Sequence, residues 1–356
     1  MELEKRDTII KKIDQNDFNE SQLEEAGKVI RNGGLAAFPT ETVYGLGGNA
    51  LDEEAAKKIY QAKGRPSDNP LIIHIADVRA LEELAKEIPE NAKKLAKAFW
   101  PGPLTMILKK AAIVPKSTTG GLDSVAIRMP NHPIALALIK QSGCYIAAPS
   151  ANTSGRPSPT LAKHVEEDLS GKIDYIIDGG EVSVGLESTI VDLTGNTVMI
   201  LRPGFITKEE LEKVVGNVEY DPAVIQKKST EKIVAKAPGM KYKHYAPKGK
   251  LTIIKGNMEH VVERINEQTI KKAQEGYQTG VIATEETKGR YQTGLVKSIG
   301  SRKEEKTIAL NLYKVLREFD AQGVEYIYSE SFEQGELGQA IMNRLLKAAG
   351  YDVWEV

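Results

Sequence analysis

The stretch "KGRPSDNPLIIHI", residues 63–75, brings together side chains suited to binding an anion. Lys63 and Arg65 are two positions apart on a turn that Pro66 stiffens, because proline fixes its own φ and holds the preceding residue extended. Two cations held close on a stiff loop repel each other unless an anion neutralises them. Arginine offers phosphate a planar fork of donors, and lysine offers a point charge. A solvated turn would explain the same pair, so this stretch alone leaves both interpretations open.

Similar residues recur at the ends of other predicted strands. Arg128 ends "SVAIR" and Arg202 ends "MILR", and a strand arginine among aliphatic residues is costly to bury without a partner. The loop "PSANTSGRPS" combines hydroxyls, an amide and Gly155, which let backbone N–H groups approach phosphate or ribose oxygens. His74 in "LIIHI" fits either a core histidine or a ligand-binding one. We expect a pocket for a nucleoside triphosphate and a small polar acid, formed by hydroxyl-rich loops and the cations Lys63, Arg65, Arg128 and Arg202.

Other motifs give weaker signals. "GLGGNA", residues 45–50, matches a dinucleotide-binding fingerprint, but that motif turns directly from a strand into a helix. Here Pro39 and several polar or aromatic residues come between, so a glycine-rich connection is the favoured interpretation. The sequence contains no phosphate-loop signature and no G-x-S-x-G elbow. Its 5 histidines show no spacing typical of metal ligands, so we expect no metal held by protein side chains.

Composition and charge set the class of protein. Hydrophobic residues make up 41% of the 356 residues and charged residues 27%, which is typical of globular domains. The net charge of -1 argues against a surface that binds polyanions everywhere, although a local basic patch remains compatible with it. A single cysteine, Cys144, excludes internal disulfides and indicates a reducing compartment. Because "MELEKRDTII" is charged and no stretch is long enough to cross a bilayer, we expect a cytoplasmic protein without membrane contact.

The first 215 residues predict helices early and strands late. This order favours an α/β domain of α+β character with a mixed sheet over simple parallel alternation. We expect residues 40–50 to form a glycine-rich loop. The predicted helices cover 19–34, 53–62, two segments within 77–99, and 133–141. The predicted strands are "GLAAFP", "PLIIHI", "PLTMILKK", "SVAIRMP", "CYIAAP", "YIIDGG", "ESTIVDL" and "TVMILRPG".

Residues 216–250 predict a linker and residues 251–356 a second domain. The segment 234–250, "VAKAPGMKYKHYAPKGK", combines lysines, tyrosines and prolines without an acid. Strand and helix patterns then alternate regularly, which is typical of a small parallel α/β domain. Its predicted strands are "LTIIKG", "TGVIAT", "LVKSIGS" and "VEYIYSE", and its predicted helices cover 258–274, 304–320 and 337–349.

An ordered set of motifs resembles a known family, the threonylcarbamoyl-AMP synthases in their long two-domain form. Between residues of about 30 and 205 the motifs are "FPTETVYGLG", "KGRPSDNPLIIH", "PGPLT", "VAIRMPNHP", "PSANTSG", "STIVDL" and "LRPG", and "APGMKYKHYAP" resembles the family's linker. Each motif is weak alone, whereas the ordered set is specific. The resemblance implies a YrdC-like domain with a twisted open mixed sheet over 1–215, a linker and active-site lid over 216–250, and a Rossmann-like α/β domain over 251–356.

The resemblance also implies a reaction. L-threonine, bicarbonate and ATP would give threonylcarbamoyl-AMP and pyrophosphate, by a nucleotidyltransferase that serves threonylcarbamoyladenosine modification of tRNA. A tRNA threonylcarbamoyl-transfer complex would receive the product, and the sequence does not decide whether this chain contacts tRNA directly. Mg²⁺ would be held mainly by the ATP phosphates, because no acidic metal cluster is evident.

The family's functional residues map onto this sequence by motif. Lys63 and Arg65 would be catalytic. Many relatives carry a hydroxyl residue at the position of Ala148, so backbone groups would take over its contact with threonine here. Arg128 would hold the threonine carboxylate, together with the other threonine-binding residues Thr42, His74 and Ser188. ATP would contact Lys63, Arg65, Asn69, Ser124, Ser150, Asn152, Ser158, Arg202 and, in the linker lid, Tyr245.

Two other functions remain open at this point. A non-catalytic RNA-binding protein would use the basic, aromatic stretch 234–250, and would bind RNA tightly without ATP. A nicotinamide-dependent enzyme would use "GLGGNA" or the second domain, although "LTIIKGNMEH" has a single glycine after its strand. NAD, and not ATP, would then protect the protein against heat. The order of substrate binding, the role of residues 251–356 and the oligomeric state are not readable from the sequence.

Overall fold

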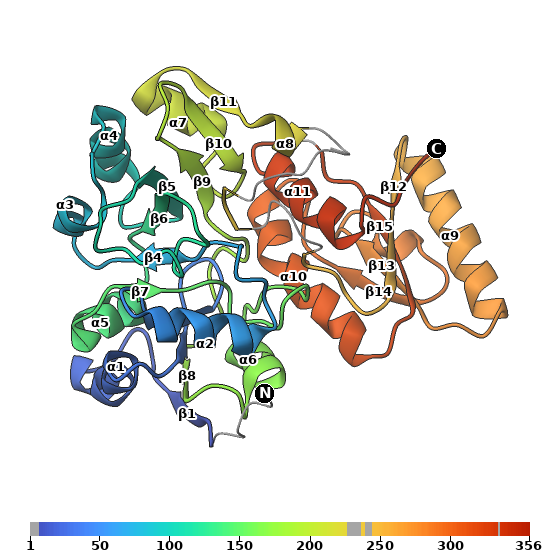
Figure 1. The fold of residues 1–356 in the computed structure, drawn as a ribbon. Coiled ribbons are helices and arrows are strands. Elements are labelled where there is room, and N and C mark those ends of the chain that lie inside the picture. The colour runs from blue at the N-terminus through green and yellow to red at the C-terminus, as the bar shows by residue number, and fades with distance from the viewer. Residues whose placement is uncertain (1–6, 226–235, 239–243, 334) are drawn as a thin grey trace. The chain divides into compact units, whose positions relative to one another are not determined.

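The structure is a computed structural model that describes residues 7–225, 236–238, 244–333 and 335–356 (Figure 1). The chain divides into two compact units. The first comprises Met1–Ser154, Ser158–Ser183 and Glu187–Lys241, and the second comprises Gly155–Pro157, Val184–Leu186 and Tyr242–Val356. Among the described helices, none has the length and apolar character that crossing a membrane requires.

The first unit contains an 11-stranded mixed sheet in the order β1-β8-β2-β3-β7-β4-β6-β5-β9-β10-β11. β4 pairs parallel to β6, and β5 pairs antiparallel to β6, so the predicted mixed sheet is confirmed. The strands are β1 (Ile9–Lys12), β2 (Ala36–Phe38), β3 (Gly45–Asn49), β4 (Ile72–His74), β5 (Leu104–Lys109), β6 (Ser124–Arg128), β7 (Ile146–Ala147), β8 (Tyr175–Asp178), β9 (Thr189–Asp192), β10 (Val198–Arg202) and β11 (Val218–Tyr220).

Four helices of the first unit, η1, α2, η2 and α7, begin after a residue whose side chain accepts a hydrogen bond from a free N–H group. Asn19 forms a capping box with Gln22 at the first turn. Leu23, Ile30 and Leu138 then pack with Phe38 in a buried apolar cluster. The helices are η1 (Glu20–Leu23), α1 (Glu24–Arg31), α2 (Glu53–Lys63), η2 (Val78–Ala80), α3 (Leu81–Leu84), α4 (Glu90–Phe99), α5 (Pro133–Ser142), α6 (Ala162–Leu169), α7 (Lys208–Val215) and α8 (Pro222–Ile225).

The prediction of a glycine-rich loop over 40–50 is wrong for its second half. Gly45–Asn49 is strand β3, which pairs antiparallel to β2 with Gly47 opposite Ala36. A Cβ at Gly47 would lie 2.7 Å from Ile146 and 2.8 Å from Phe38, so the strand needs glycine for close packing. Glycine is unfavourable in strands by propensity alone, and the sequence pattern therefore concealed this strand.

The second unit contains a 5-stranded parallel sheet in the order β14-β13-β15-β12-β16. The predicted helix over 258–274 is confirmed, and strand β16 (Val353–Glu355) was not predicted. The other strands are β12 (Lys250–Lys255), β13 (Thr279–Ala283), β14 (Leu295–Ser298) and β15 (Tyr326–Glu330). The helices are α9 (Met258–Gln274), η3 (Lys288–Arg290), α10 (Glu305–Ala321) and α11 (Gly338–Ala348).

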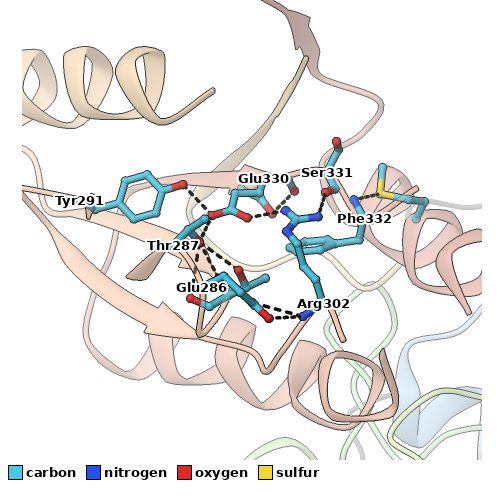
Figure 2. Close-up of polar contacts among 10 residues, drawn as sticks. Glu286, Thr287, Tyr291, Arg302, Glu330, Ser331 and Phe332 are labelled. Carbon is cyan, nitrogen blue, oxygen red and sulfur yellow. Dashed lines mark hydrogen bonds and ion pairs between the residues drawn. The ribbon is translucent and has the colours of Figure 1, made fainter. Parts of the chain in front are cut away.

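A buried carboxylate ties together the loops at the carboxyl end of this second sheet (Figure 2). Glu330, at the end of β15, is fully buried and accepts hydrogen bonds from Thr287 and Tyr291. Arg302 pairs with the same carboxylate and lies 5.0 Å above the ring of Phe332. A buried charge is tolerated only while its partners are in place. The cluster therefore holds together the three loops that follow β13, β14 and β15.

We predict that Glu330→Ala destabilises the second unit by about 3 to 5 kcal/mol, because the substitution leaves Arg302 without its carboxylate. The matched control is Glu267→Ala, which removes an exposed ion pair with Arg264 and should cost less than about 1 kcal/mol. Urea unfolding followed by Trp354 fluorescence in a Trp100→Phe background reports this unit alone, since the chain has 2 tryptophans. Equal unfolding free energies for both variants would contradict the prediction.

Candidate functional site

A single row of cross-strand partners carries several of the predicted site residues. His74 on β4 is paired with Arg128 on β6, and Arg128 with Thr105 on β5. The row continues through Ile190 on β9 to Arg202 on β10. Directly paired residues point to the same face of a sheet. Residues separated by up to 128 positions in the chain, from 74 to 202, thus share one face; we call them the cross-strand row.

Arg128 is buried at the centre of this row, with 4% of its surface exposed. Its Nη1 donates a hydrogen bond to Thr42 Oγ1 at 3.0 Å, and its Nη2 lies 2.7 Å from Glu41 Oε1. Thr40 Oγ1 lies 2.9 Å from Thr42 Oγ1 and donates to the carbonyl of Val43 at 2.6 Å. The segment "PTET" therefore presents a carboxylate and a hydroxyl to the same guanidinium.

Arg202 is the second buried guanidinium of the row, with 5% exposed. Its Nη2 donates to Ser188 Oγ at 3.1 Å, and Ser188 Oγ lies 2.7 Å from Thr105 Oγ1. Next to Ser188, Glu187 accepts a hydrogen bond from Ser158 at 2.5 Å. Sheet register places Arg202 in the same row as Arg128. Arg202 hydrogen-bonds Ser188, and the neighbouring Glu187 hydrogen-bonds Ser158, so these predicted residues lie in one part of the unit.

Lys63, Ser150 and Asn152 form a second group, which we call the lysine cluster. Lys63 ends α2 and is 1% exposed. Its Nζ donates to the carbonyls of Ser150 and, at 2.5 Å, Asn152. Ser150 Oγ donates to Asn152 Oδ1 at 2.5 Å, which folds the "PSAN" loop around the lysine. Lysine and loop are thereby held in one place although 87 positions separate Lys63 from Ser150.

Arg65 and Asn69 flank the lysine cluster on the turn after α2. Gly64, at φ 60°, ends the helix in a left-handed conformation, and half-buried Arg65 then donates to the carbonyl of Pro70 at 3.2 Å. Asn69 is 1% exposed, and its Oδ1 has no hydrogen-bond partner among the residues that the structure describes. A buried acceptor of this kind is available to a ligand.

Three predicted residues stand apart from these groups. Ser124 begins β6, four residues before Arg128 and on the same face, so roughly 13 Å separate the two along the strand. Tyr245 belongs to the second unit, where its ring packs against Tyr313 with centroids 5.2 Å apart. The backbone N–H of Ala148 donates to Ile72 at 2.8 Å, so this donor is committed to the sheet. Of the predicted lid, residues 226–235 and 239–243 lie outside the described residues.

Glu41, Thr105, Glu187 and His132 are buried near the predicted residues, although the motifs of the sequence did not mark them as site residues. Thr105 is the one polar residue among the apolar side chains of "LTMIL", and that was an available signal. Glu41 and Glu187 are acids next to the predicted residues Thr42 and Ser188, and both are 6% exposed. Their role depends on burial and register, which the sequence does not provide.

The two histidines of the site are neutral near pH 7. Burial, followed by the positive charge of Arg128, lowers the pKa of His74 to about 3. Burial lowers the pKa of His132 to about 4, against the opposing effect of the Glu41 charge. Both rings can therefore hydrogen-bond a ligand without adding charge.

The composition of the site suits the binding and alignment of anions. It combines buried cations with hydroxyl groups, and the described residues contain no group of three or more His, Cys, Asp or Glu side chains that could hold a metal ion. Such a site stabilises charge that develops on phosphate or carboxylate oxygens.

We predict that acid destabilises the first unit through His74. The pKa of His74 is lower in the folded state than in the unfolded chain, where it is about 6.5, so the unfolded state binds more protons as pH falls below 6.5. At pH 5 this histidine should lower the unfolding free energy by about 2 kcal/mol relative to pH 7.

His74→Asn should remove that part of the pH dependence. Its control is His260→Asn, which changes an exposed histidine of α9. Urea unfolding followed by Trp100 fluorescence in a Trp354→Phe background measures the first unit. An unchanged difference between pH 5 and pH 7 in His74→Asn would contradict the assignment.

Two family models match the chain in succession. Residues 28–204 match the model described as "Telomere recombination". Residues 206–350 match the model described as "Threonylcarbamoyl-AMP synthase, C-terminal domain".

Similar proteins extend over nearly the full length. A threonylcarbamoyl-AMP synthase of Pyrococcus abyssi is 53% identical, over 95% of this chain and 97% of its own. A threonylcarbamoyl-AMP synthase of Bacillus subtilis is 50% identical, over 95% of each chain. The crystal structure of P. abyssi Sua5 complexed with L-threonine superposes with a TM-score of 0.92 at 51% identity, over 98% of this chain and 100% of that one.

Proposed function

The chain belongs to the threonylcarbamoyl-AMP synthases, and on that basis we propose that its buried cations Arg128 and Lys63 bind different substrates. Its function is the synthesis of threonylcarbamoyl-AMP, and this product supplies threonylcarbamoyladenosine modification of tRNA. The substrates of the proposed reaction are L-threonine, bicarbonate and ATP. The observation that carries this assignment is the convergence of His74, Arg128 and Arg202 in one row of the sheet.

L-threonine binds at the Arg128 part of the row in this proposal. Arg128 receives the carboxylate, because a guanidinium matches a carboxylate with two parallel N–H donors. Thr42, which already hydrogen-bonds Arg128, orients the ligand, and His74 and Ser188 contribute a neutral ring and a hydroxyl. A relative of this chain is known in complex with L-threonine, which supports the choice of ligand.

ATP binds across the lysine cluster and the turn after α2. Lys63 and Arg65 receive phosphate oxygens, and the buried Oδ1 of Asn69 accepts a further ligand hydrogen bond. The remaining contacts are those of the family motifs: Ser124, Ser150, Asn152, Ser158, Arg202 and the lid residue Tyr245. Because Lys63 is held by carbonyls and not by solvent, it can meet phosphate charge without reorganising water.

Nucleotidyl transfer follows from this arrangement. A carboxylate oxygen of N-carboxylated threonine attacks the α-phosphorus in line, the new P–O bond forms, and pyrophosphate leaves. The residues of the site neutralise phosphate charge and align the reactants, so no covalent nucleophile is needed. Excluding water protects the N-carboxylated intermediate and the mixed anhydride, and a linker lid carrying Tyr245 would serve that purpose.

Mg²⁺ enters this proposal with the nucleotide. No group of acids among the described residues forms a metal cage, so phosphate oxygens and water would supply its ligands. When bound, the ion would neutralise part of the triphosphate charge, and Lys63 and Arg65 would meet the rest.

The product is passed on after synthesis. The proposed recipient is a tRNA threonylcarbamoyl-transfer complex, and the proposed location is the cytoplasm, where the single Cys144 stays reduced.

Pyrophosphate release tests the function directly. The complete mixture of L-threonine, bicarbonate and ATP should give pyrophosphate and threonylcarbamoyl-AMP, and omission of any one substrate should abolish both. Pyrophosphate release without threonine would identify a different ATP-cleaving activity.

We predict that Lys63→Met and Arg65→Ala each lower kcat/KM for ATP at least about 100-fold, because each removes a donor that stabilises the transferring phosphates. Methionine keeps most of the volume of the buried lysine but leaves the carbonyls of Ser150 and Asn152 without this donor, so a thermal melt of the variant accompanies the kinetic measurement. Lys57→Met provides the control, since Lys57 lies on the same helix in an exposed pair with Glu54. Near-normal turnover in Lys63→Met would remove the lysine from the chemistry.

We also predict that chelation of divalent cations stops pyrophosphate release without lowering the melting temperature of the ATP-free protein, because the metal travels with the nucleotide. The readouts are a coupled pyrophosphate assay and a thermal melt, each with and without EDTA. A lower melting temperature in EDTA would instead indicate a metal held by the protein.

A further inference from the structure

Glu41 is a buried carboxylate to which the proposed reaction has so far given no role. It is 6% exposed, and its Oε1 lies 2.7 Å from Arg128 Nη2. Within the described part of the chain, both Glu41 oxygens and Arg128 Nη2 lack a properly aligned hydrogen-bond partner. An ionised carboxylate has about four acceptor positions. The pair is close, yet both Glu41 oxygens and Arg128 Nη2 keep unused hydrogen-bonding positions.

The backbone holds Glu41 in this place. Its carbonyl accepts a hydrogen bond from Ser183 N at 3.2 Å. On its other side, Thr40 Oγ1 accepts hydrogen bonds from the N–H groups of Thr42 and Val43, at 3.2 and 3.3 Å. This local turn keeps the carboxylate next to Arg128 and beside the Thr42 hydroxyl.

Neutralisation of Arg128 alone does not explain these features. A buried ion pair contributes stability only when its remaining donors and acceptors are also satisfied, and buried polar atoms are nearly always bonded. Here both partners keep unused hydrogen-bonding positions next to each other. A ligand that carries a carboxylate and an ammonium on neighbouring atoms would fill both sets, and an α-amino acid has that arrangement.

We propose that Glu41 binds the ammonium group of the amino-acid substrate whose carboxylate lies on Arg128, and that it accepts one proton from this group during N-carboxylation. The inference rests on the proposed function, since it assigns the amine of the same L-threonine. The three N–H donors of an ammonium match the unused acceptor positions of Glu41. Glu41 is then a catalytic residue that contacts the substrate.

The proton balance of the step requires such an acceptor. The threonine ammonium and bicarbonate give the N-carboxylated amino acid, water and one proton. The C–N bond forms and a C–O bond of bicarbonate breaks. One proton of the nitrogen leaves with the departing hydroxyl as water, and the second goes to Glu41.

His132 is a second buried ionisable side chain on which the charge of Glu41 acts. It precedes α5, is 5% exposed, and has a buried Nδ1 without a partner among the described residues. Burial lowers the pKa of His132 and the Glu41 charge raises it, so the ring is neutral and close enough to feel that carboxylate. Among the described residues, Glu41 pairs with Arg128, and their charges act on His132 and His74 respectively.

The test compares two ligands that differ in the amine. L-Threonine carries it, and 3-hydroxybutyrate has the same carboxylate and hydroxyl without it. For Glu41→Gln we expect calorimetry to show at least tenfold weaker binding of L-threonine, with 3-hydroxybutyrate bound at least as well as by the unmodified protein. Glu41→Asp should keep most of the threonine affinity. Glu54→Gln, an exposed change on α2, is the control and should alter neither.

A pH profile separates proton acceptance from binding. In Glu41→Gln, kcat/KM for threonine should rise with pH as more free amine is present in solution, while the unmodified protein should show a flatter profile. Equal weakening of both ligands, or unchanged threonine binding in Glu41→Gln, would overturn the proposal and leave Glu41 a structural partner of Arg128. If the unmodified protein releases no pyrophosphate with all three substrates, the proposed function fails instead.

Discussion

The register between β4, β6, β5, β9 and β10 is the constraint on which the first unit's site depends. Side chains alternate between the two faces of a strand, so a slip of one residue would turn Arg128 away from Thr42 and Glu41. The site is therefore as rigid as the sheet that carries it. This rigidity suits a reaction that depends on aligning three reactants and not on a reactive side chain.

Burying these cations costs desolvation free energy, and a different kind of acceptor offsets that cost for Lys63 and for Arg128. Lys63 is held by carbonyls of the "PSAN" loop, whereas Arg128 faces the carboxylate of Glu41. Carbonyl oxygens leave a lysine able to receive phosphate charge, and a carboxylate keeps an arginine oriented before its ligand arrives. The two groups are thereby prepared for different anions within one unit.

The sequence identified the chemistry of this site better than its geometry. Strand-end arginines and the ordered motifs pointed to Arg128, Arg202 and Lys63, because burying or crowding a cation is costly wherever it occurs. Strand β3 was missed because its glycines serve a packing need at Gly47 that depends on Ile146, about 100 positions away. Glu41 was missed for a similar reason: its partner is 87 positions distant, and only the fold brings them together. The elements of the second unit were easier to predict, because its strands and helices alternate regularly along the chain.

Pairing Glu41 with Arg128 also sets a condition on the ligand. Both side chains are nearly fully buried, so a molecule that offers only a carboxylate leaves the acceptor positions of Glu41 unfilled, and one that offers only an amine leaves Arg128 Nη2 without an aligned acceptor. A site with buried polar groups on both sides rejects such analogues far more strongly than an apolar pocket rejects a missing methylene. Zwitterionic amino acids satisfy both charges at once. Choice among amino acids must then come from neutral groups, since Thr105 of the row and the adjacent Thr42 and Ser188 supply hydroxyls that a polar side chain could contact.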